Sequence, residues 1–545
     1  MVENPDHFVE KKMSKAILVG IAGSYNAFSL SLYNIKAFAY NDPEIRDKWD
    51  LSVIQHRFIN LSRKDVEVPR LIDQIVEANP DLVAFSCYMW NVNIYNEIAR
   101  ALRKRTPNTK IIWGGPEMSS DYLLQGKFDN FEMDYCVYGE GEKTFLEFLK
   151  NQISGVPALP NIPGLAYRDN PTKPFKINSK REPMESLDEV PSPFLTGAVD
   201  DEVLLRSKIE GNIETQRGCN LRCSYCIYHK DMDRITYSSV DRVVAETRYL
   251  VNKGVKRIMF VDANFSSDLD YAKTIIQAFI QQKFELRLMF ELIPGFIDEE
   301  LATLFEEFSS IYPWNDITLG VGVQSTNLET LKNLRRGIKI DKFNYTFDLI
   351  KKHNLMAKID LIIGLPGENI SHIEASLEFM MDTMGFGREH LLCIHVMRAL
   401  PGTELVEIGE KNNMTFSSKY EPHEFIESPD LPRKDMLKCL RRTAVIFRLT
   451  NTRSWVGREF VSGKKSEDVT IREAFFNARE RLDLTNIELV DLIVEGLMDH
   501  LKARNSRFVQ PDFPNAEDWW WNLSAFEVTN EWLLEYLANL EPCTV

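Results

Sequence analysis

The chain has 545 residues, which is enough for several domains and excludes a small scaffold held together by disulfides or a structural metal. Its 80 acidic residues exceed its 65 Lys and Arg residues, and the net charge of −15 argues against a main role in coating nucleic acid or an anionic membrane. With 44% hydrophobic and 27% charged residues, most of the chain is expected to be globular rather than disordered.

The first 150 residues alternate short apolar runs with longer amphipathic segments. Helical patterns such as 68–78 and 94–105 lie between the apolar runs. Strands are predicted at 16–21, 51–55, 81–87, 110–115 and 135–139. This alternation predicts a doubly wound, Rossmann-like α/β domain over residues 1–150, in which ligands bind beyond the carboxyl ends of the strands.

A proline-rich stretch at 151–205 has weak periodicity and is interpreted as a linker. A second β/α series follows, which predicts a partial (β/α)6 barrel over residues 206–410 with its chemistry at the carboxyl ends of the strands. The six predicted strands are 213–216, 257–262, 286–292, 317–324, 357–364 and 391–398.

Residues 411–545 show helical patterns, for example at 471–481 and 487–502, and are predicted to form a helical C-terminal domain. The basic run at 433–442 is interpreted as a solvated helix face. The scattered histidines, including His395, are expected to be surface or satisfied core residues. No apolar run is long enough for a transmembrane helix and no secretory signal is visible, so a cytoplasmic location is expected.

Three cysteines lie close together directly after the first strand of the predicted barrel. Cys219, Cys223 and Cys226 have the spacing C-x3-C-x2-C, so their thiolates can hold three irons of a [4Fe-4S] cluster and leave the fourth iron without a protein ligand. The alternative is a structural zinc, for which His229 would complete the set of four ligands. Zinc is disfavoured because four ligands within eleven residues would close a very small loop.

The spacing of these cysteines resembles that of the radical S-adenosylmethionine (SAM) enzymes, in which an aromatic residue such as Tyr225 often precedes the last cysteine. The resemblance implies that the three cysteines bind the cluster and that SAM binds its open iron. Transfer of an electron from the cluster would then cleave SAM to give a 5′-deoxyadenosyl radical. Further matches follow the barrel strands at the positions where this family binds SAM, and they are Asp262, Asn264, Glu291, Gln324, Ser325 and Arg398.

Arg398 is open to two interpretations. Its guanidinium can pair with the carboxylate of SAM, or it can simply cap the barrel.

A doubly wound domain before such a barrel resembles the cobalamin-binding domain of the cobalamin-dependent branch of this family. The resemblance implies that Ser86 and Gly114, with the adjacent Gly115, line a slot for the nucleotide tail, and that Gly139 and Glu140 form its far wall. The Asp-x-His-x-x-Gly signature that supplies a histidine to cobalt is absent after the first strand. A nucleotide, or no ligand at all, is the alternative for this domain.

The resemblance implies a methyltransferase that uses a [4Fe-4S] cluster, SAM and cobalamin to methylate an unactivated carbon of a metabolite or peptide. An electron donor such as flavodoxin or ferredoxin is the expected partner. Two alternatives remain: a cyclase or rearrangement enzyme of the same branch without methyl transfer, and a non-catalytic cobalamin or redox sensor.

Overall fold

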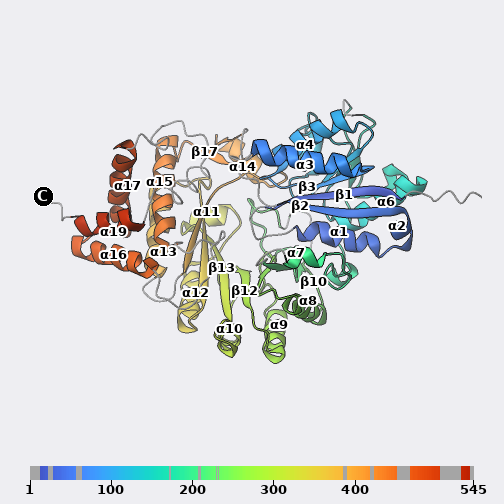
Figure 1. Ribbon diagram of the computed structural model, residues 1–545. Coiled ribbons are helices and arrows are strands. Elements are labelled where there is room, and N and C mark those ends of the chain that lie inside the picture. The colour runs from blue at the N-terminus through green and yellow to red at the C-terminus, as the bar shows by residue number, and fades with distance from the viewer. Residues whose placement is uncertain are drawn as a thin grey trace, which may run out of the picture. The chain divides into compact units, whose positions relative to one another are not determined.

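The computed structural model describes residues 13–22, 29–56, 64–170, 173–205, 210–228, 230, 232, 234–384, 390–417, 423–450, 467–503 and 530–540. The chain divides into two compact units, Met1–Ser207 and Lys208–Val545 (Figure 1). None of the helices in the described ranges is both long and apolar enough to cross a membrane.

The first unit is built on a sheet whose parallel part has the order β2-β1-β3-β4-β5. The five strands are β1 (Ser14–Ile21), β2 (Trp49–His56), β3 (Leu82–Ser86), β4 (Lys110–Gly114) and β5 (Tyr135–Val137). All five coincide with predicted strands, so the predicted doubly wound fold is confirmed. β1 is buried from Ala16 to Ile21, and β3 is buried over its whole length, because both faces of the sheet are covered by helices.

Helices lie on both faces of this sheet. α1 (Leu30–Tyr40), α2 (Pro43–Lys48) and α6 (Gly141–Ser154) contribute Leu32, Ile45 and Phe148 to one core. α3 (Lys64–Ala78) and α4 (Val92–Arg105) pack together on the opposite face (Figure 1). Because the chain order reverses between β1 and β3, the carboxyl ends of these two strands form the crevice where such sheets bind ligands.

The predicted linker differs from the structure in one respect, because part of it extends the sheet. β6 (Leu165–Tyr167) pairs antiparallel with β5, and β7 (Lys176–Ile177) pairs with β6. Strands this short carry too little periodicity to be recognised in a proline-rich sequence. The stretch also contains α7 (Asp201–Leu205) and two short 3₁₀ helices, η2 (Leu159–Asn161) and η3 (Leu187–Glu189).

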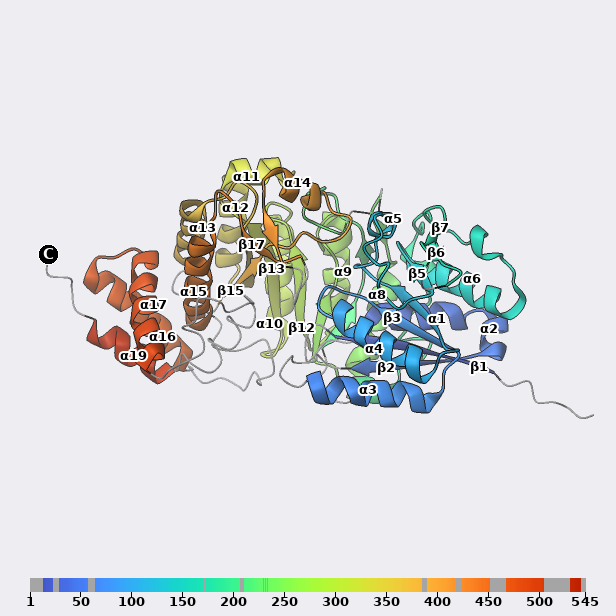
Figure 2. The same ribbon diagram turned by 90° about the horizontal axis from the view of Figure 1, so that it is seen from above.

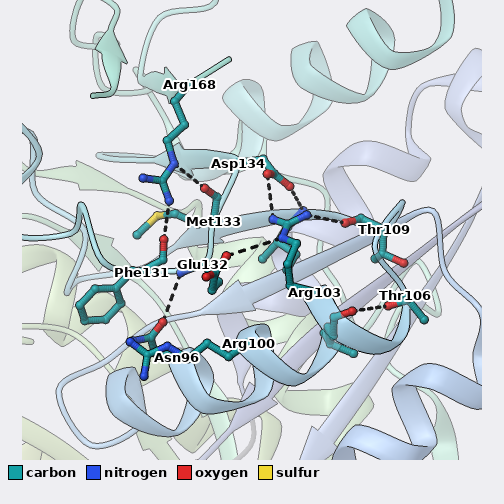
Figure 3. Close-up of polar contacts among 12 residues, drawn as sticks. Asn96, Arg100, Arg103, Thr106, Thr109, Phe131, Glu132, Met133, Asp134 and Arg168 are labelled. Atoms are coloured by element: carbon teal, nitrogen blue, oxygen red, sulfur yellow. Dashed lines mark hydrogen bonds and ion pairs between the residues drawn. The ribbon is translucent and has the colours of Figure 1, made fainter. Parts of the chain in front are cut away.

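Arg168, just after β6, ties this extension to the loop before β5, which follows α5 (Ser120–Leu124). Its guanidinium donates hydrogen bonds to the carbonyls of Met133 at 2.9 Å, Asp129 at 3.2 Å and Phe131 (Figure 3). Burial lowers the pKa of Arg168, and this effect outweighs the nearby carboxylates, which act to raise that pKa. Such a buried cation that binds carbonyl groups fixes the loop, so the added strands are an integral part of the first unit.

The second unit contains a six-stranded parallel sheet in sequential order, as expected for a partial barrel. Its strands are β8 (Gly211–Ile213), β11 (Arg257–Phe260), β12 (Arg287–Leu292), β13 (Asp316–Gln324), β14 (Met356–Ile363) and β15 (Leu391–Val396). All six overlap the predicted strands, and the connecting helices are α8 (Val240–Asn252), α9 (Leu269–Gln282), α10 (Glu299–Ile311), α11 (Leu328–Asn333), α12 (Ile340–Lys352) and α13 (Ile370–Met384).

Helices dominate the end of the chain, as predicted. After α14 (Leu405–Lys411) and a hairpin of β16 (Thr415–Phe416) and β17 (Phe425–Glu427) come α15 (Arg433–Thr450), α16 (Glu467–Leu482), α17 (Asn486–Ala503) and α19 (Asn530–Asn539) (Figure 2). The interpretation of 433–442 as a solvated face is wrong for Arg442. Its side chain is 1% exposed and pairs with Asp491 of α17 at 2.6 Å and with Glu374 of α13 at 2.5 Å.

Candidate active site

The cysteine loop leaves the barrel after β8 and is closed at its base by two short strands. β9 (Gln216–Arg217) pairs antiparallel with β10 (Thr236–Tyr237), so the two ends of the loop lie side by side. Gly218 follows β9 with a φ of +97°, and a Cβ there would lie 2.8 Å from the carbonyl oxygen of Arg234. Only glycine therefore allows the two ends to approach this closely.

The three cysteines are positioned on this one loop. Cys223 is buried, whereas Cys219 and Cys226 are partly exposed. Burial raises the pKa of the Cys226 thiol to about 11 and also raises the pKa of Cys219. Among the described residues, no three His, Cys, Asp or Glu side chains are already placed to hold a metal ion. His229, the fourth ligand of the zinc alternative, lies outside the described residues.

Asp262, predicted to contact the cofactor, holds the backbone that leads into the cysteine loop. Its carboxylate accepts hydrogen bonds from the N–H groups of Thr215 at 2.8 Å and Gln216 at 3.0 Å, and from the Thr215 hydroxyl at 2.6 Å. Burial raises the pKa of Asp262 to about 7, although these hydrogen bonds oppose the rise. The role that the structure gives Asp262 is to position the loop.

Asn264, two residues further on, has one side of its amide engaged and the other unused. Its Oδ1 accepts a hydrogen bond from the N–H of Ile293 at 3.1 Å. Its Nδ2 is buried and has no hydrogen-bond partner among the described residues. A buried amide donor without a partner costs free energy, so this group fits a ligand that brings an acceptor.

Ser325 is buried and forms hydrogen bonds within the protein. Its hydroxyl donates to the carboxylate of Glu368 and accepts from the N–H of Asn327 at 3.0 Å. Burial raises the pKa of Glu368 to about 7. The structure therefore uses Ser325 to connect the loops that follow β13 and β14.

Gln324 ends β13 in a strained conformation. Its φ is +69°, and the pairing register with β14 shifts between Gly322 and Gln324. A Cβ on Gly322 would lie 2.6 Å from Nε2 of Gln324 and 2.9 Å from Nη2 of Arg336. The bulge and the missing side chain thus turn Gln324 and Arg336 toward the same space.

Four charged or titratable side chains from β12, β14 and β15 meet, and one of them, His395, has a side chain that is 54% exposed. Nζ of Lys358 lies 3.0 Å from Oε1 of Glu291 and 3.1 Å from Oδ2 of Asp360, whose Oδ1 lies 2.9 Å from Nε2 of His395. Burial alone would lower the pKa of Lys358, but the two carboxylates outweigh it and raise that pKa. Burial likewise opposes ionisation of Asp360, yet Lys358 and His395 lower its pKa.

Glu291 is thus a predicted cofactor residue whose carboxylate already has a partner in the chain. Arg398 is another, because its Nη2 lies 3.3 Å from Oε2 of Glu424. The ion pair with Glu424 is compatible with a cap of the barrel, and a contact of Arg398 with SAM stays a prediction. Tyr225 lies in the cysteine loop next to Cys223, and burial raises the pKa of its phenol.

The predicted cobalamin residues surround the carboxyl ends of β3, β4 and β5. The Ser86 hydroxyl lies 3.3 Å from that of Ser31 in α1. Gly114 and Gly139 leave space, since a Cβ on Gly114 would make only ordinary contacts and one on Gly139 would meet nothing within 4 Å.

The remaining two predicted residues in this domain contact other parts of the chain. A Cβ on Gly115 would lie 2.5 Å from the Cys87 carbonyl oxygen, so this glycine permits close packing of two strand ends. Glu140 accepts a hydrogen bond from the N–H of Met184 at 2.7 Å.

Sequence reasoning missed Arg336 and Lys358, which the fold brings to the barrel site. Arg336 follows another arginine in a loop, and Lys358 is a single charge within an apolar strand. No periodicity or spacing marks either residue. His395 was expected to be a surface or satisfied core residue, and its half-exposed side chain bonds to Asp360 of the same charged group.

Comparison with known proteins identifies both domains. Residues 213–380 match the Radical SAM superfamily, and residues 53–149 match the B12 binding domain. The chain is 27% identical over 355 residues to "Cobalamin-dependent radical SAM methyltransferase TokK" of Streptomyces tokunonensis, an alignment that covers 62% of this chain and 49% of TokK.

A second relative is the "2-(S-pantetheinyl)-carbapenam-3-carboxylate methyltransferase" of Streptantibioticus cattleyicolor, 25% identical over 358 residues, or 62% of this chain and 48% of the relative. The chain thus spans about half the length of these curated relatives. The solved structure of the cobalamin-dependent SAM radical enzyme OxsB superposes with a TM-score of 0.63 over 97% of this chain and 79% of that chain, at 14% identity, and shows the fold.

The residues present fit the cofactors that these domains imply. Three thiols on one loop suit an iron–sulfur cluster. The Nδ2 of Asn264, which has no hydrogen-bond partner among the described residues, suits a polar ligand, and the space at Gly139 suits a bulky ligand at the strand ends. The expected set of a [4Fe-4S] cluster, SAM and cobalamin agrees with both domain matches. The chain therefore combines a B12-binding domain with a radical SAM domain, which is the composition of the cobalamin-dependent radical SAM enzymes that its sequence resembles.

Proposed function

We propose that this protein is a cobalamin-dependent radical SAM methyltransferase that methylates an unactivated carbon of a small molecule or peptide. The observation that carries the proposal is the loop with Cys219, Cys223 and Cys226 at the carboxyl end of the first barrel strand, in a chain that also has a B12-binding domain. Both curated relatives described above are named methyltransferases, which favours methyl transfer over the alternatives.

The proposed substrate class takes its support from the same relatives. One of them is named for a carbapenam carboxylate that bears a pantetheinyl thioether, which is a small and polar metabolite. The group of Glu291, Lys358, Asp360 and His395 on β12, β14 and β15 offers polar side chains that can hydrogen-bond to such a molecule. We therefore favour a small polar metabolite as the substrate and retain a peptide as the second choice.

In the proposed enzyme, the chain's own residues position the cofactors and the substrate. The cluster supplies an electron to cleave SAM and cobalamin supplies a methyl group, so the protein contributes binding, orientation and exclusion of water. Asp262 and Gly218 fix the start of the cysteine loop. The Asn264 Nδ2 group would donate a hydrogen bond to an acceptor of SAM.

The reaction needs an external electron donor, for which a small low-potential protein such as flavodoxin or ferredoxin is the proposed partner. Cysteines that must remain reduced favour a reducing compartment such as the cytoplasm.

The test is anaerobic purification with iron and cobalamin, followed by mass spectrometry of the nucleoside and substrate products. Supply of SAM, a reductant and a panel of small metabolites that includes the pantetheinyl carbapenam is expected to give 5′-deoxyadenosine and a product heavier by one CH2 group. A product of unchanged carbon count would support the cyclase or rearrangement alternative. Failure to form 5′-deoxyadenosine would support the sensor.

The matched variants are Cys223→Ala and Cys439→Ala. The first removes a proposed cluster ligand and is expected to abolish 5′-deoxyadenosine formation while corrinoid binding is retained. The second removes a buried thiol from α15, outside the cysteine loop, and is expected to leave both properties unchanged. Loss of corrinoid binding together with cluster function in Cys223→Ala would contradict a chain of two separate cofactor domains.

A further inference from the structure

Arg336 is a buried arginine that contacts a cysteine of the loop. It follows α11, and its residue is 6% exposed. Its Nη1 donates to Sγ of Cys223 at 3.6 Å, and its Nη2 donates to the carbonyl of Gly322 on β13. The absence of a side chain on Gly322 makes room for the guanidinium, since a Cβ there would lie 2.9 Å from Nη2.

The positive charge of Arg336 has no carboxylate to balance it among the described residues. No Asp or Glu forms an ion pair with it there, and its Nε–H is buried without a hydrogen-bond partner in the same part of the chain. Burial of an unpaired guanidinium costs several kcal/mol in general, so a buried arginine implies an anionic partner. Among the described residues, the side-chain group to which its guanidinium hydrogen-bonds is the sulfur of Cys223, a proposed cluster ligand.

The neighbouring Arg335 shows what an ordinary arginine does in the same loop. Its guanidinium is 47% exposed and pairs with Glu404, and its Nε donates to the Arg222 carbonyl at 2.9 Å. The two residues carry the same charge one position apart, but only Arg336 bonds to a cysteine sulfur. Arg335 is therefore a matched control for Arg336.

We propose that Arg336 is a positioning residue that holds the Cys223 sulfur and raises the reduction potential of the cluster bound by the loop; this inference rests on the proposed function. A [4Fe-4S] cluster that accepts one electron gains one negative charge. A fixed cation and an N–H···S hydrogen bond at a ligand sulfur stabilise the reduced form more than the oxidised form. Because the site is buried, solvent screens this effect only weakly.

The experiment compares wild type with Arg336→Gln, Arg336→Lys and Arg335→Gln after reconstitution with iron and sulfide. The reduced cluster is followed by electron paramagnetic resonance during a potentiometric titration with titanium(III) citrate. SAM is left out, so that any contact of Arg336 with SAM does not contribute. Arg336→Gln is expected to lower the ratio of reduced to oxidised cluster at a fixed potential about tenfold, which is about 59 mV for one electron.

The other two variants test whether the shift needs a buried charge and whether it needs the hydrogen bonds of Arg336. Arg335→Gln is expected to keep the wild-type potential. Arg336→Lys keeps the charge but cannot bond to both Gly322 and Cys223, so a smaller downward shift is expected. If Arg336→Gln does not bind a cluster, the reduction potential of the Arg336→Lys cluster is the deciding measurement. A wild-type potential in the loaded Arg336 variants, or an equal shift in Arg335→Gln, overturns the inference, whereas a wild-type protein that binds no cluster overturns the proposed function.

Discussion

Replacement of Asp262 by alanine is expected to release the start of the cysteine loop. The carboxylate accepts hydrogen bonds from two backbone N–H groups and one hydroxyl, all on Thr215 and Gln216. Both of these residues are buried, with exposures of 0% and 2%, so water cannot replace the lost acceptor. The change therefore leaves buried donors unpaired at the point where the chain enters the loop.

The cost follows from the number of donors. Each buried N–H that loses its partner costs about 1–3 kcal/mol, so the two N–H groups together cost about 2–6 kcal/mol. Since about 1.4 kcal/mol is a factor of ten in an equilibrium constant, the ratio of molecules with an ordered loop to those with a disordered loop falls by more than about tenfold. Asp262→Asn keeps an acceptor oxygen for the N–H groups and resembles the protonated acid, whose pKa is about 7. This variant is expected to behave nearly as wild type.

The assay measures iron and sulfide per protein chain, together with SAM binding and 5′-deoxyadenosine formation. Asp262→Ala is expected to lose cluster content, and Asp262→Asn to retain it. A direct contact between the Asp262 carboxylate and SAM predicts a different pattern, in which both variants keep a full cluster and both bind SAM weakly. That pattern would refute the positioning role argued from the hydrogen bonds.

Three further changes test other parts of the structure. Burial places the pKa of Glu368 at about 7, above its usual 4.5, so this group's contribution to stability is lost as pH rises between these values. Glu368→Gln is therefore expected to gain up to about 3 kcal/mol over wild type between pH 5 and pH 8 in thermal unfolding, and a difference independent of pH would contradict this. Arg442→Met is expected to lower the free energy of unfolding by about 1–3 kcal/mol, because its two acidic partners lose a buried cation. Lys438→Met, at a side chain that is 47% exposed, is expected to change the free energy of unfolding little. Gly115→Ala is expected to lower the unfolding temperature and corrinoid binding, because φ at this position is +105° and a backbone atom would lie 2.5 Å from the new Cβ. Gly139→Ala, at a φ of +75° with nothing within 4 Å of the Cβ, is expected to cost only about 1 kcal/mol of backbone strain. Equal effects of the two substitutions would contradict the packing role of Gly115.

The strands could be predicted from the sequence because local composition determines them. β3 is buried at all five positions, so the sequence shows one continuous apolar run between turn residues. β6 and β7 could not be predicted, since they have three and two residues and depend on the edge of a sheet formed by distant strands. The cysteines could be identified for a similar reason, because their spacing lies within a single loop.

The roles of the predicted site residues were harder to assign, because position at a strand end does not say where a side chain points. Asp262 and Asn264 end the same segment, yet one holds the backbone of the cysteine loop and the other keeps an unused donor. Ser325 and Glu140 likewise bond within the chain. The sequence motifs therefore point to these strand ends, and the hydrogen bonds of the structure separate the residues that bond within the chain from those with groups left for a ligand.

The charged group on β12, β14 and β15 shows why such partners stay hidden in a sequence. Glu291, Gly320 and Lys358 lie next to one another on β12, β13 and β14, in one row of the pairing register. A Cβ on Gly320 would lie 2.3 Å from Glu291, so the glycine on the middle strand is what lets the acid and the lysine meet across it. The ion pair joins residues 67 positions apart and needs a glycine from a third segment. It arises from the register of three strands, and the register is set by burial along all of them rather than by any short motif.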